Sequence, residues 1–239
     1  MFSSTISGLV PNTTYYVRAY AFSYSGTASY GEQFSFTTTA SRASTTDIGG
    51  NTYQLVTICN QTWIQTNLNV TKYRNGDIIP QVTDATQWIG LTTGAWCYLN
   101  NDPANAVLGK LYNWYAVNDP RGLAPLGYHI PTDAEWTTLT TCLGGYSIAG
   151  SAMKETGNNY WYGDYPTGTN SSGFTALPGG YRSDRGAFYN DGMSGCWWSS
   201  SEPLVGVYAY DLYLNNNNGS SFRNFDSETN GLSVRCIKD

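Results

Sequence analysis

The sequence predicts an α+β fold, with two helices followed by a loop-rich antiparallel β region and a separate all-β unit at the N-terminus. In the first forty residues, apolar and polar side chains alternate with the period of a β-strand. Two segments in the middle of the chain have apolar residues at helical spacing. Beyond residue 146, short apolar runs are separated by glycines, as in a sheet with many turns.

The composition excludes two classes of protein. The 239 residues are 41% hydrophobic and 12% charged, so the chain can fill a core and is not disordered. The net charge is −5, and the 12 Lys and Arg residues are spread thinly, so nucleic-acid binding is not expected. No apolar run has the length of a membrane span, and no signal peptide is recognisable. An exported form of this chain would therefore have been trimmed at its N-terminus.

The cysteines are five in number and contain no C-x-x-C pair, which makes a structural zinc site improbable. They are Cys59, Cys97, Cys142, Cys196 and Cys236. Two interpretations stay open: two disulfides with one thiol left over, or buried free cysteines that behave as small hydrophobic residues.

Residues 1–39 are predicted to form a β unit of their own. The alternating residues Pro11, Thr13, Tyr15 and Val17 follow a turn, and residues 31–37 form a second strand. This spacing resembles the corner and following strand of a fibronectin type III domain, in which a tyrosine hydroxyl ties a loop to the strand. So few strands cannot bury two sheet faces, so we interpret the unit as a partial module. Its open edge could pair with a strand of another chain, giving self-assembly.

Residues 40–46 are small and polar and are predicted to form a linker. The second domain then runs over residues 47–239. It begins with a hairpin, in which strand 51–59 is followed by a turn at Asn60 and Gln61 and by a partner strand over 62–66.

The two helices are expected at residues 110–117 and after Pro131. In the first, Leu111, Trp114 and Tyr115 would share one face. The second begins with a capping box, Thr132-Asp-Ala-Glu135, and ends at a pair of glycines. Its apolar positions have helical spacing, and they are Trp136, Leu139 and Leu143.

The C-terminal segment between two apolar blocks, residues 195–202 and 232–237, consists mainly of Tyr, Phe, Asn, Ser and Asp. This composition is typical of antibody paratopes, in which aromatic side chains give contact area and small polar ones give hydrogen bonds. The pair Trp197-Trp198 is predicted to lie in the core, with a sugar-stacking platform as the alternative. Residues 215–219 are predicted to form a solvated turn.

Side-chain alternation predicts which residues of this segment face outward. In strand 207–214 we expect Ala209, Leu212 and Leu214 to be buried and Asp211 and Tyr213 to be exposed. Beyond the turn, Ser221, Arg223 and Phe225 are expected to extend the exposed face. The predicted ligand-binding residues are Tyr189, Asn190, Asp191, Tyr208, Asp211, Tyr213, Asn215, Asn217, Arg223 and Phe225.

Six sequence blocks carry a family resemblance. They are WIQTNLNV (63–70), GKLYNWYAV (109–117), PLGYHIPTDAEW (125–136), SGFTALPGGYR (172–182), WWSSSE (197–202) and LSVRC (232–236). In this order they closely resemble the Fibrobacter succinogenes major paralogous domain of bacterial surface proteins. The resemblance implies a C-type-lectin-like fold, related to formylglycine-generating enzymes and to the variable proteins of diversity-generating retroelements. It also implies an extracellular or cell-surface location.

One position departs from the family pattern. Members usually carry a cysteine where this chain has Ala124, and that cysteine would be expected to pair with the equivalent of Cys236. Here Cys236 is therefore either unpaired or bonded to Cys142 or Cys196. The sequence leaves these alternatives open.

Catalytic and metal sites are not predicted. His129 is the sole histidine, so a multi-histidine metal site cannot form, and a structural role is expected. Asp133 and Glu135 are explained by helix capping. A calcium-lectin site needs clustered oxygen ligands, but this chain has only Glu202-Pro-Leu204 and no later Trp-Asn-Asp. No cofactor is predicted, although a structural calcium ion near Asp184, Asp191 or Asp226 is left open.

These observations favour a non-enzymatic, cell-surface ligand-binding or adhesion protein, whose partner is an unidentified protein or carbohydrate. The segment could be diversified by a retroelement, because mutation of template adenines turns Asn codons into Asn, Ser, Asp, Tyr, Gly and Phe codons. One alternative is a structural subunit of a surface layer or filament. A weaker alternative is an enzyme of the formylglycine-generating type, although no block here reproduces that enzyme's reactive cysteine pair.

Overall fold

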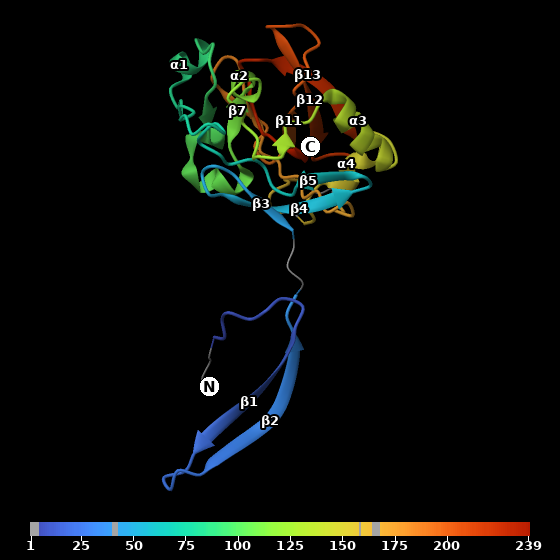
Figure 1. Cartoon of the computed structure of the whole chain (residues 1–239). Helices are drawn as coiled ribbons and strands as arrows, with labels where there is room; N and C mark the ends of the chain where they lie inside the picture. The colour runs from blue at the N-terminus through green and yellow to red at the C-terminus, as the bar shows by residue number, and fades with distance from the viewer. Residues whose placement is uncertain (1–4, 40–42, 158, 164–167) are drawn as a thin grey trace. The chain divides into compact units, whose positions relative to one another are not determined.

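The computed structural model describes residues 5–39, 43–157, 159–163 and 168–239. The chain divides into two compact units, Met1–Ala43 and Ser44–Asp239 (Figure 1). Within the described residues, no helix is both long enough and apolar enough to cross a membrane.

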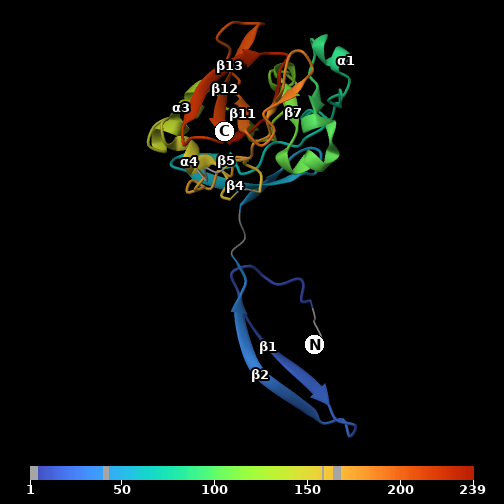
Figure 2. The same cartoon turned by 180° about the vertical axis from the view of Figure 1, so that it is seen from behind.

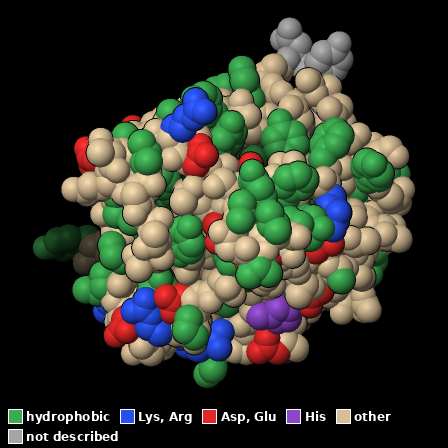
Figure 3. Space-filling model, turned by 90° about the horizontal axis from the view of Figure 1, so that it is seen from above, with side chains coloured by type: hydrophobic (Ala, Val, Ile, Leu, Met, Phe, Trp, Pro, Cys, Tyr) green, Lys and Arg blue, Asp and Glu red, His purple; other side chains and the backbone are tan. Residues whose placement is uncertain are grey.

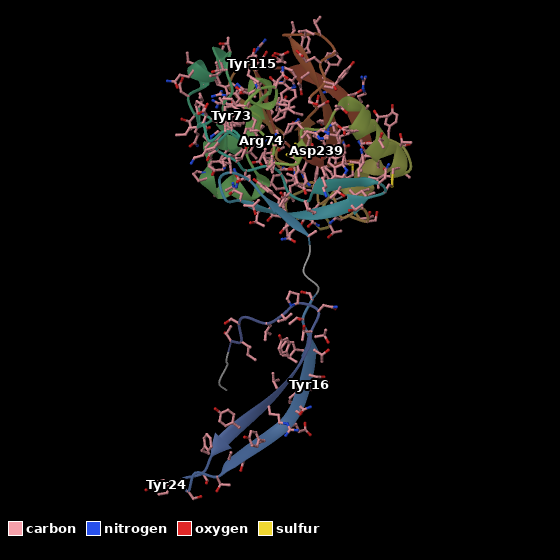
Figure 4. The ribbon with its side chains drawn as sticks, in the orientation of Figure 1. Tyr16, Tyr24, Tyr73, Arg74, Tyr115 and Asp239 are labelled. Carbon is pink, nitrogen blue, oxygen red and sulfur yellow. A yellow bond between two sulfur atoms is a disulfide. The ribbon has the colours of Figure 1, made fainter. Side chains whose placement is uncertain are left out.

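The first unit is a β-hairpin of β1 (Thr14–Phe22) and β2 (Ala28–Thr37). The strands are antiparallel, with a register shift between Arg18 and Tyr20. The rings of Tyr15 and Phe36 stack with centroids 6.0 Å apart. Large side chains project from the hairpin into solvent, among them the labelled Tyr16 and Tyr24 (Figure 4).

The described part of the second unit contains three antiparallel sheets. The first has the order β3-β4-β5-β15-β8, with β3 (Ser44–Thr46), β4 (Thr52–Ile58), β5 (Gln61–Ile64), β15 (Ile237–Lys238) and β8 (Tyr128–His129). The second has the order β10-β9-β14-β7-β6, with β10 (Phe188–Tyr189), β9 (Tyr181–Arg182), β14 (Gly231–Leu232), β7 (Leu111–Asn113) and β6 (Trp96–Cys97). The third has the order β11-β12-β13, with β11 (Ser194–Trp198), β12 (Tyr208–Asn215) and β13 (Ser221–Ser227).

Short helices connect and cover these sheets, which confirms the α+β class. They are α1 (Ala85–Ile89), α2 (Trp114–Val117), α3 (Asp133–Cys142) and α4 (Ala149–Met153), with 3₁₀ segments at Leu99–Asn101 and Pro103–Leu108. In both views α3 lies beside β12 and β13 (Figures 1 and 2). The prediction of two helices was therefore incomplete, because α1 and α4 have only five residues each and weak sequence signals.

The predicted helix over residues 110–117 was wrong in its first half. Leu111–Asn113 is strand β7, which pairs with β14 on one side and β6 on the other. The helix begins only at Trp114, where the Asn113 side chain accepts a hydrogen bond from the Ala116 amide. Pairing with two strands outweighs the helical spacing of the side chains.

Helix α3 begins where the sequence predicted. The Thr132 hydroxyl accepts a hydrogen bond from the Glu135 amide, and the Glu135 carboxylate accepts one from the Thr132 amide. Trp136 and Leu139 are buried, and the helix ends at Leu143, before the two glycines. The capping box is confirmed.

The β4–β5 hairpin is confirmed, but its turn is at Cys59 and Asn60 rather than one residue later, because Ile58 pairs with Gln61. Cys59 has φ of 53° there and forms a disulfide with Cys142 at the end of α3. The other three cysteines, including Cys236, are free and buried. The predicted linker also proved shorter, because Ser44–Thr46 pairs with β4, while residues 40–42 lie outside the described residues.

The two apolar blocks near the C-terminus, residues 195–202 and 232–237, contribute to the core. Trp197 and Trp198 are fully buried, which confirms the core prediction and excludes a sugar-stacking platform. They enter different clusters: Trp197 packs with Trp63 and Trp136, whereas Trp198 packs with Tyr112. The apolar block at residues 232–237 is shared between two short strands, β14 and β15, which belong to different sheets and so tie them together.

Candidate ligand-binding surface

The sheet β11-β12-β13 carries most of the predicted ligand-binding residues. Residues directly opposite each other on antiparallel strands share a face, and neighbours along a strand alternate. One face, here called the α3 face, carries Tyr208, Tyr210, Leu212, Leu214, Ser221, Arg223 and Phe225. The opposite face carries Ala209, Asp211, Tyr213, Phe222, Asn224 and Asp226.

The register contradicts the prediction of a single exposed face. Leu212 pairs with Arg223 and Asp211 with Asn224, so Arg223 lies across the sheet from the side chain of Asp211. The prediction carried odd-numbered positions through the turn, but Leu214 pairs with Ser221 across the six residues 215–220, so odd positions of one strand pair with even positions of the other. A shift of one residue moves every side chain to the other face. Asp211 and Tyr213 therefore cannot join Arg223 and Phe225 in one contact surface.

Burial of β12 agrees with the prediction at Ala209, Leu212 and Leu214, which are all buried. It disagrees at Asp211, which is only 2% exposed, and Tyr213 is half-buried. Beyond the turn, Ser221 was expected to be exposed but is also 2% exposed. Its amide donates to the Tyr146 carbonyl at 2.7 Å, which closes the start of β13 against the loop after α3.

A cavity of about 370 Å³ lies between α3 and the edge of the sheet. We call it the α3 groove. It is lined by Asp133, Trp136, Thr137, Thr140, Thr141, Gly145 and Tyr146 on one side and by Asp211, Leu212, Ser221, Phe222 and Arg223 on the other. Three threonines on one side of α3 thus give the groove a wall of hydroxyl groups, while the strand side contributes an arginine and an aromatic ring.

Arg223 closes one end of the α3 groove. Its Nε donates to Asp133 Oδ1 at 2.6 Å, and its guanidinium lies 3.8 Å from the centroid of the Tyr210 ring. The hydrogen bond to Asp133 is the main reason that the pKa of Arg223 is raised. The arginine is held by two partners yet keeps a side chain that is 55% exposed, so it can still contact a ligand.

An aromatic pair continues the α3 face beyond Arg223. Tyr208 and Phe225 pack edge to face with centroids 5.6 Å apart. Both are exposed, Phe225 by 54%. Residues 222–225 of the edge strand β13 are exposed on both faces, whereas β11, at the other edge of the same sheet, is buried. Figure 3 shows one side of the molecule, on which hydrophobic patches are separated by uncharged polar surface and by scattered charged groups.

The loop residues predicted to join this surface have other partners. Tyr189 lies in β10 and stacks on Tyr181 with centroids 5.5 Å apart, while the Asp191 carboxylate accepts a hydrogen bond from Asn100. Asn190 has φ of 60° and is half-buried in the turn between β10 and β11. These three residues lie on strands and turns outside the groove lining.

The two asparagines proposed as ligand contacts shape the turn. The Asn215 side chain accepts a hydrogen bond from the Asn217 amide at 3.0 Å and donates one to the Tyr213 hydroxyl at 2.7 Å. Residues 216–220 connect β12 and β13, so the turn lies one residue later than the predicted 215–219. Asn215 thus acts on the backbone of the turn, and Asn217 is exposed at its tip.

A second cavity, of about 390 Å³, brings together acidic residues from separate segments of the chain. Its lining includes Tyr115, Glu202 and Glu228, and Tyr115 is labelled in Figure 4. Burial, with a hydrogen bond to Glu202, raises the pKa of Glu228 to about 7. Glu228 is distant in sequence from Glu202, so only the fold could pair them.

The remaining candidate groups have structural partners. His129 lies between Glu135 and Asp239, and Glu135 caps α3. Among the described residues, no group of three or more His, Cys, Asp or Glu side chains is arranged to hold a metal ion.

Comparison with known proteins gives one family. A model described as the Fibrobacter succinogenes major domain matches residues 56–238. The match begins within β4 and ends in β15, so it includes the α3 groove and the second and third sheets but neither β3 nor the hairpin of β1 and β2. No curated protein and no solved structure matches the chain.

Proposed function

This chain belongs to the Fibrobacter succinogenes major domain family, and within that family we propose that it is a non-enzymatic, cell-surface protein that binds a ligand for adhesion. The α3 groove and its aromatic rim carry the proposal. The cavity volume of about 370 Å³ lies in the range of small-ligand sites, about 300–1,000 Å³. The ligand is a carbohydrate or a short protein segment.

The chemistry of the groove supports recognition of a neutral, hydroxyl-rich ligand or a peptide. Threonine hydroxyls on α3 both donate and accept hydrogen bonds. Arg223 and Phe225 are of the residue types that dominate binding energy when a partner covers them. Tyr208 adds a rigid aromatic surface at little cost in side-chain entropy.

We also propose a finer assignment of the two units. Residues 47–239 would have a C-type-lectin-like fold, supported by the family match and by the short helices around twisted antiparallel strands. Residues 1–39 would be part of a fibronectin type III module. This is supported by the Tyr15 hydroxyl, which accepts a hydrogen bond from the Val10 amide at 2.8 Å and so ties the preceding loop to β1.

Array binding tests the groove. Wild type and the variants Arg223→Ala and Phe225→Ala would be applied to glycan and protein arrays, and any hit measured by titration. Each variant is expected to weaken binding about tenfold or more, as for contacts near the centre of an interface. Tyr189→Ala is the matched control, because Tyr189 is a similarly exposed aromatic residue outside the groove. A ligand that binds all four proteins equally would contradict the assignment.

Diversification by a retroelement is proposed as a property of β13. The side chains of residues 222–225 are exposed on both faces, so substitution there costs little stability. A reverse transcriptase gene and a near-copy of the codons for this segment should then lie beside the gene. Their absence from the genomic sequence would contradict diversification but not ligand binding.

A structural role in a surface assembly is the second candidate. It is favoured by the hairpin of β1 and β2, on which Tyr16, Tyr20 and Phe34 are each more than 60% exposed. Light scattering after size-exclusion chromatography distinguishes the two, because a monodisperse monomer argues against self-assembly through this hairpin.

The burial of the free thiols does not support the enzyme alternative. Cys97, Cys196 and Cys236 are buried, whereas a catalytic thiol has to reach its substrate.

A further inference from the structure

Asp211 is an anomaly on the face of the sheet opposite α3. The residue is 2% exposed, and both carboxylate oxygens are buried without a hydrogen-bond partner. A buried polar group without a partner costs free energy of about 1–3 kcal/mol, and a buried charge costs more. Trp198 and Asn224 flank it as its direct neighbours on β11 and β13.

A second carboxyl group faces the same site. Asp226 lies two residues beyond Asn224 on β13, so its side chain is diagonal to that of Asp211 on the same face. Burial first, and then the nearby charge of Asp226, raise the pKa of Asp211 well above its usual range. Burial, with a further contribution from Asp184, also raises the pKa of Asp226.

No basic side chain compensates these two acids. The groups that act on Asp211 are Asp226 and the Asn224 amide, and no lysine or arginine of the described chain is among them. Elsewhere in this domain buried ionic groups have partners: Lys110 donates to Asn69, and Arg235 donates to Asn67. The pair of carboxyl groups thus lacks the counter-charge that two buried acids need.

We propose that Asp211 and Asp226 bind one calcium ion on this face of the sheet. Both oxygens of Asp211 would be ligands, with Asp226 as the second carboxylate and the Asn224 amide oxygen as a neutral one. Calcium accepts carboxylates, amide oxygens and water in flexible geometry, so water can complete the shell. Asn224 is exposed, which gives the ion a path from solvent to the buried carboxylate.

The neighbouring thiol does not favour a softer metal. Cys196 lies on the same face of β11, but burial raises its pKa well above the usual value, so it stays protonated. The described residues contain no third carboxylate, cysteine or histidine grouped for a metal. With two carboxylates, the affinity is expected in the weaker calcium range, about 10⁻⁴ to 10⁻³ M, as in extracellular modules.

The ion would join β12 to the edge strand β13. Arg223 and Phe225 lie on the other face of β13, between and beside the proposed ligands. Calcium would therefore hold the strand that presents Arg223 and Phe225 on the α3 face.

Terbium luminescence tests the site in the full chain, freed of metal beforehand. Tb³⁺ replaces calcium at oxygen sites, and Trp198, directly opposite Asp211, is near enough to sensitise its emission. Wild type is expected to show emission that Ca²⁺ displaces, and about 10 mM Ca²⁺ should raise the melting temperature by about 3 °C or more.

Two variants decide the assignment. Asp211→Asn and Asp226→Asn are each expected to abolish the Tb³⁺ emission and the Ca²⁺ shift. Asp191→Asn, an exposed acid outside the site, should leave both unchanged. If Asp211→Asn does not fold, the less buried Asp226→Asn decides. Absence of emission in wild type, or emission that persists in both variants, overturns the proposal and leaves a pair of acids that share a proton.

Discussion

At the scale of single residues, His129 lies between two carboxylates. Its Nδ1 is 2.8 Å from Asp239 Oδ1, and its Nε2 is 2.9 Å from Glu135 Oε1. Partial burial opposes protonation, but the hydrogen bonds to Asp239 and Glu135 outweigh it and raise the pKa of His129 above its ordinary value of 6.5. The ring thereby joins the C-terminus to the first turn of α3.

This arrangement predicts a pH-dependent contribution to stability. Because the folded pKa is raised, the contribution is full below the unfolded pKa of 6.5 and is lost as the pH rises through the folded pKa. His129→Gln is expected to lower the free energy of unfolding more at about pH 5.5 than at about pH 8.5. Urea unfolding at both pH values measures this.

Because the chain has one histidine, its pKa can be measured directly by NMR. A proton NMR titration of wild type should give a pKa above 6.5, and Asp239→Asn should bring it down, because one of the two acceptors is weakened. Equal losses of stability for His129→Gln at both pH values would show that the imidazolium contributes nothing.

Buried basic residues were beyond sequence prediction. Charged residues are scarce, yet Lys110, Arg182 and Arg235 are all nearly inaccessible to solvent. Arg235 donates to the carbonyls of Ile64 and Phe174, and burial lowers its pKa to about 9. An arginine in an apolar strand pattern gives no sign of which loop carbonyls it will meet, because those lie more than sixty residues away.

At the scale of elements, the sequence predicted the start of a helix correctly where the hydrogen bonds of its first backbone amides are made by residues close in the chain. Thr132 and Glu135 cap α3 through each other, so a window of four residues contains the whole interaction. The helix prediction failed at residues 111–113 for the opposite reason. Their backbone is satisfied by β6 and β14, of which β14 lies more than a hundred residues away.

The disulfide between Cys59 and Cys142 joins the β4–β5 turn to the end of α3. It closes a loop with a sequence separation of 83 residues. In the chain-entropy model a loop of this length stabilises the fold by about 4 kcal/mol. Cys59→Ala with Cys142→Ala is therefore expected to lower the free energy of unfolding by about 2–4 kcal/mol, measured by urea denaturation without reductant.

Reductant provides the matched comparison. Both half-cystines are exposed, so dithiothreitol should destabilise wild type to a similar extent and leave the double variant unchanged. Cys97→Ala alters a buried free thiol instead. The change that it causes in the free energy of unfolding should be the same with and without dithiothreitol. If dithiothreitol leaves the stability of wild type unaltered, the bridge is not formed in solution.

At the scale of the whole molecule, the apolar clusters of the described residues all lie in the second unit. Their members run from Tyr53 to Ile237. The hairpin of β1 and β2 has no such cluster and exposes most of its aromatic side chains. An isolated two-stranded hairpin is marginally stable at best in water.

A fragment of residues 44–239 is accordingly expected to fold alone, with a melting temperature within about 2 °C of the full chain. Differential scanning calorimetry of both proteins under oxidising conditions makes the comparison. A fragment starting at residue 53, which removes β3 and the start of β4, should melt lower because the retained Tyr53 and Gln54 lose their strand partners Thr45 and Ser44. A large loss already in the 44–239 fragment would mean that the hairpin stabilises the second unit.

The sequence by itself determined the α+β class, the family, the capped start of α3, the hairpin at residues 51–66 and the burial of the tryptophan pair. These features depend on residues close together in the chain or on blocks whose order is fixed. The tertiary structure alone decided which face of β12 and β13 each side chain occupies. Leu214 pairs with Ser221 across six residues, so odd positions pair with even ones: Arg223 and Phe225 lie on one face, and Asp211 and Asp226 lie on the other. Strand register depends on long-range packing, and a shift of one residue reverses every face.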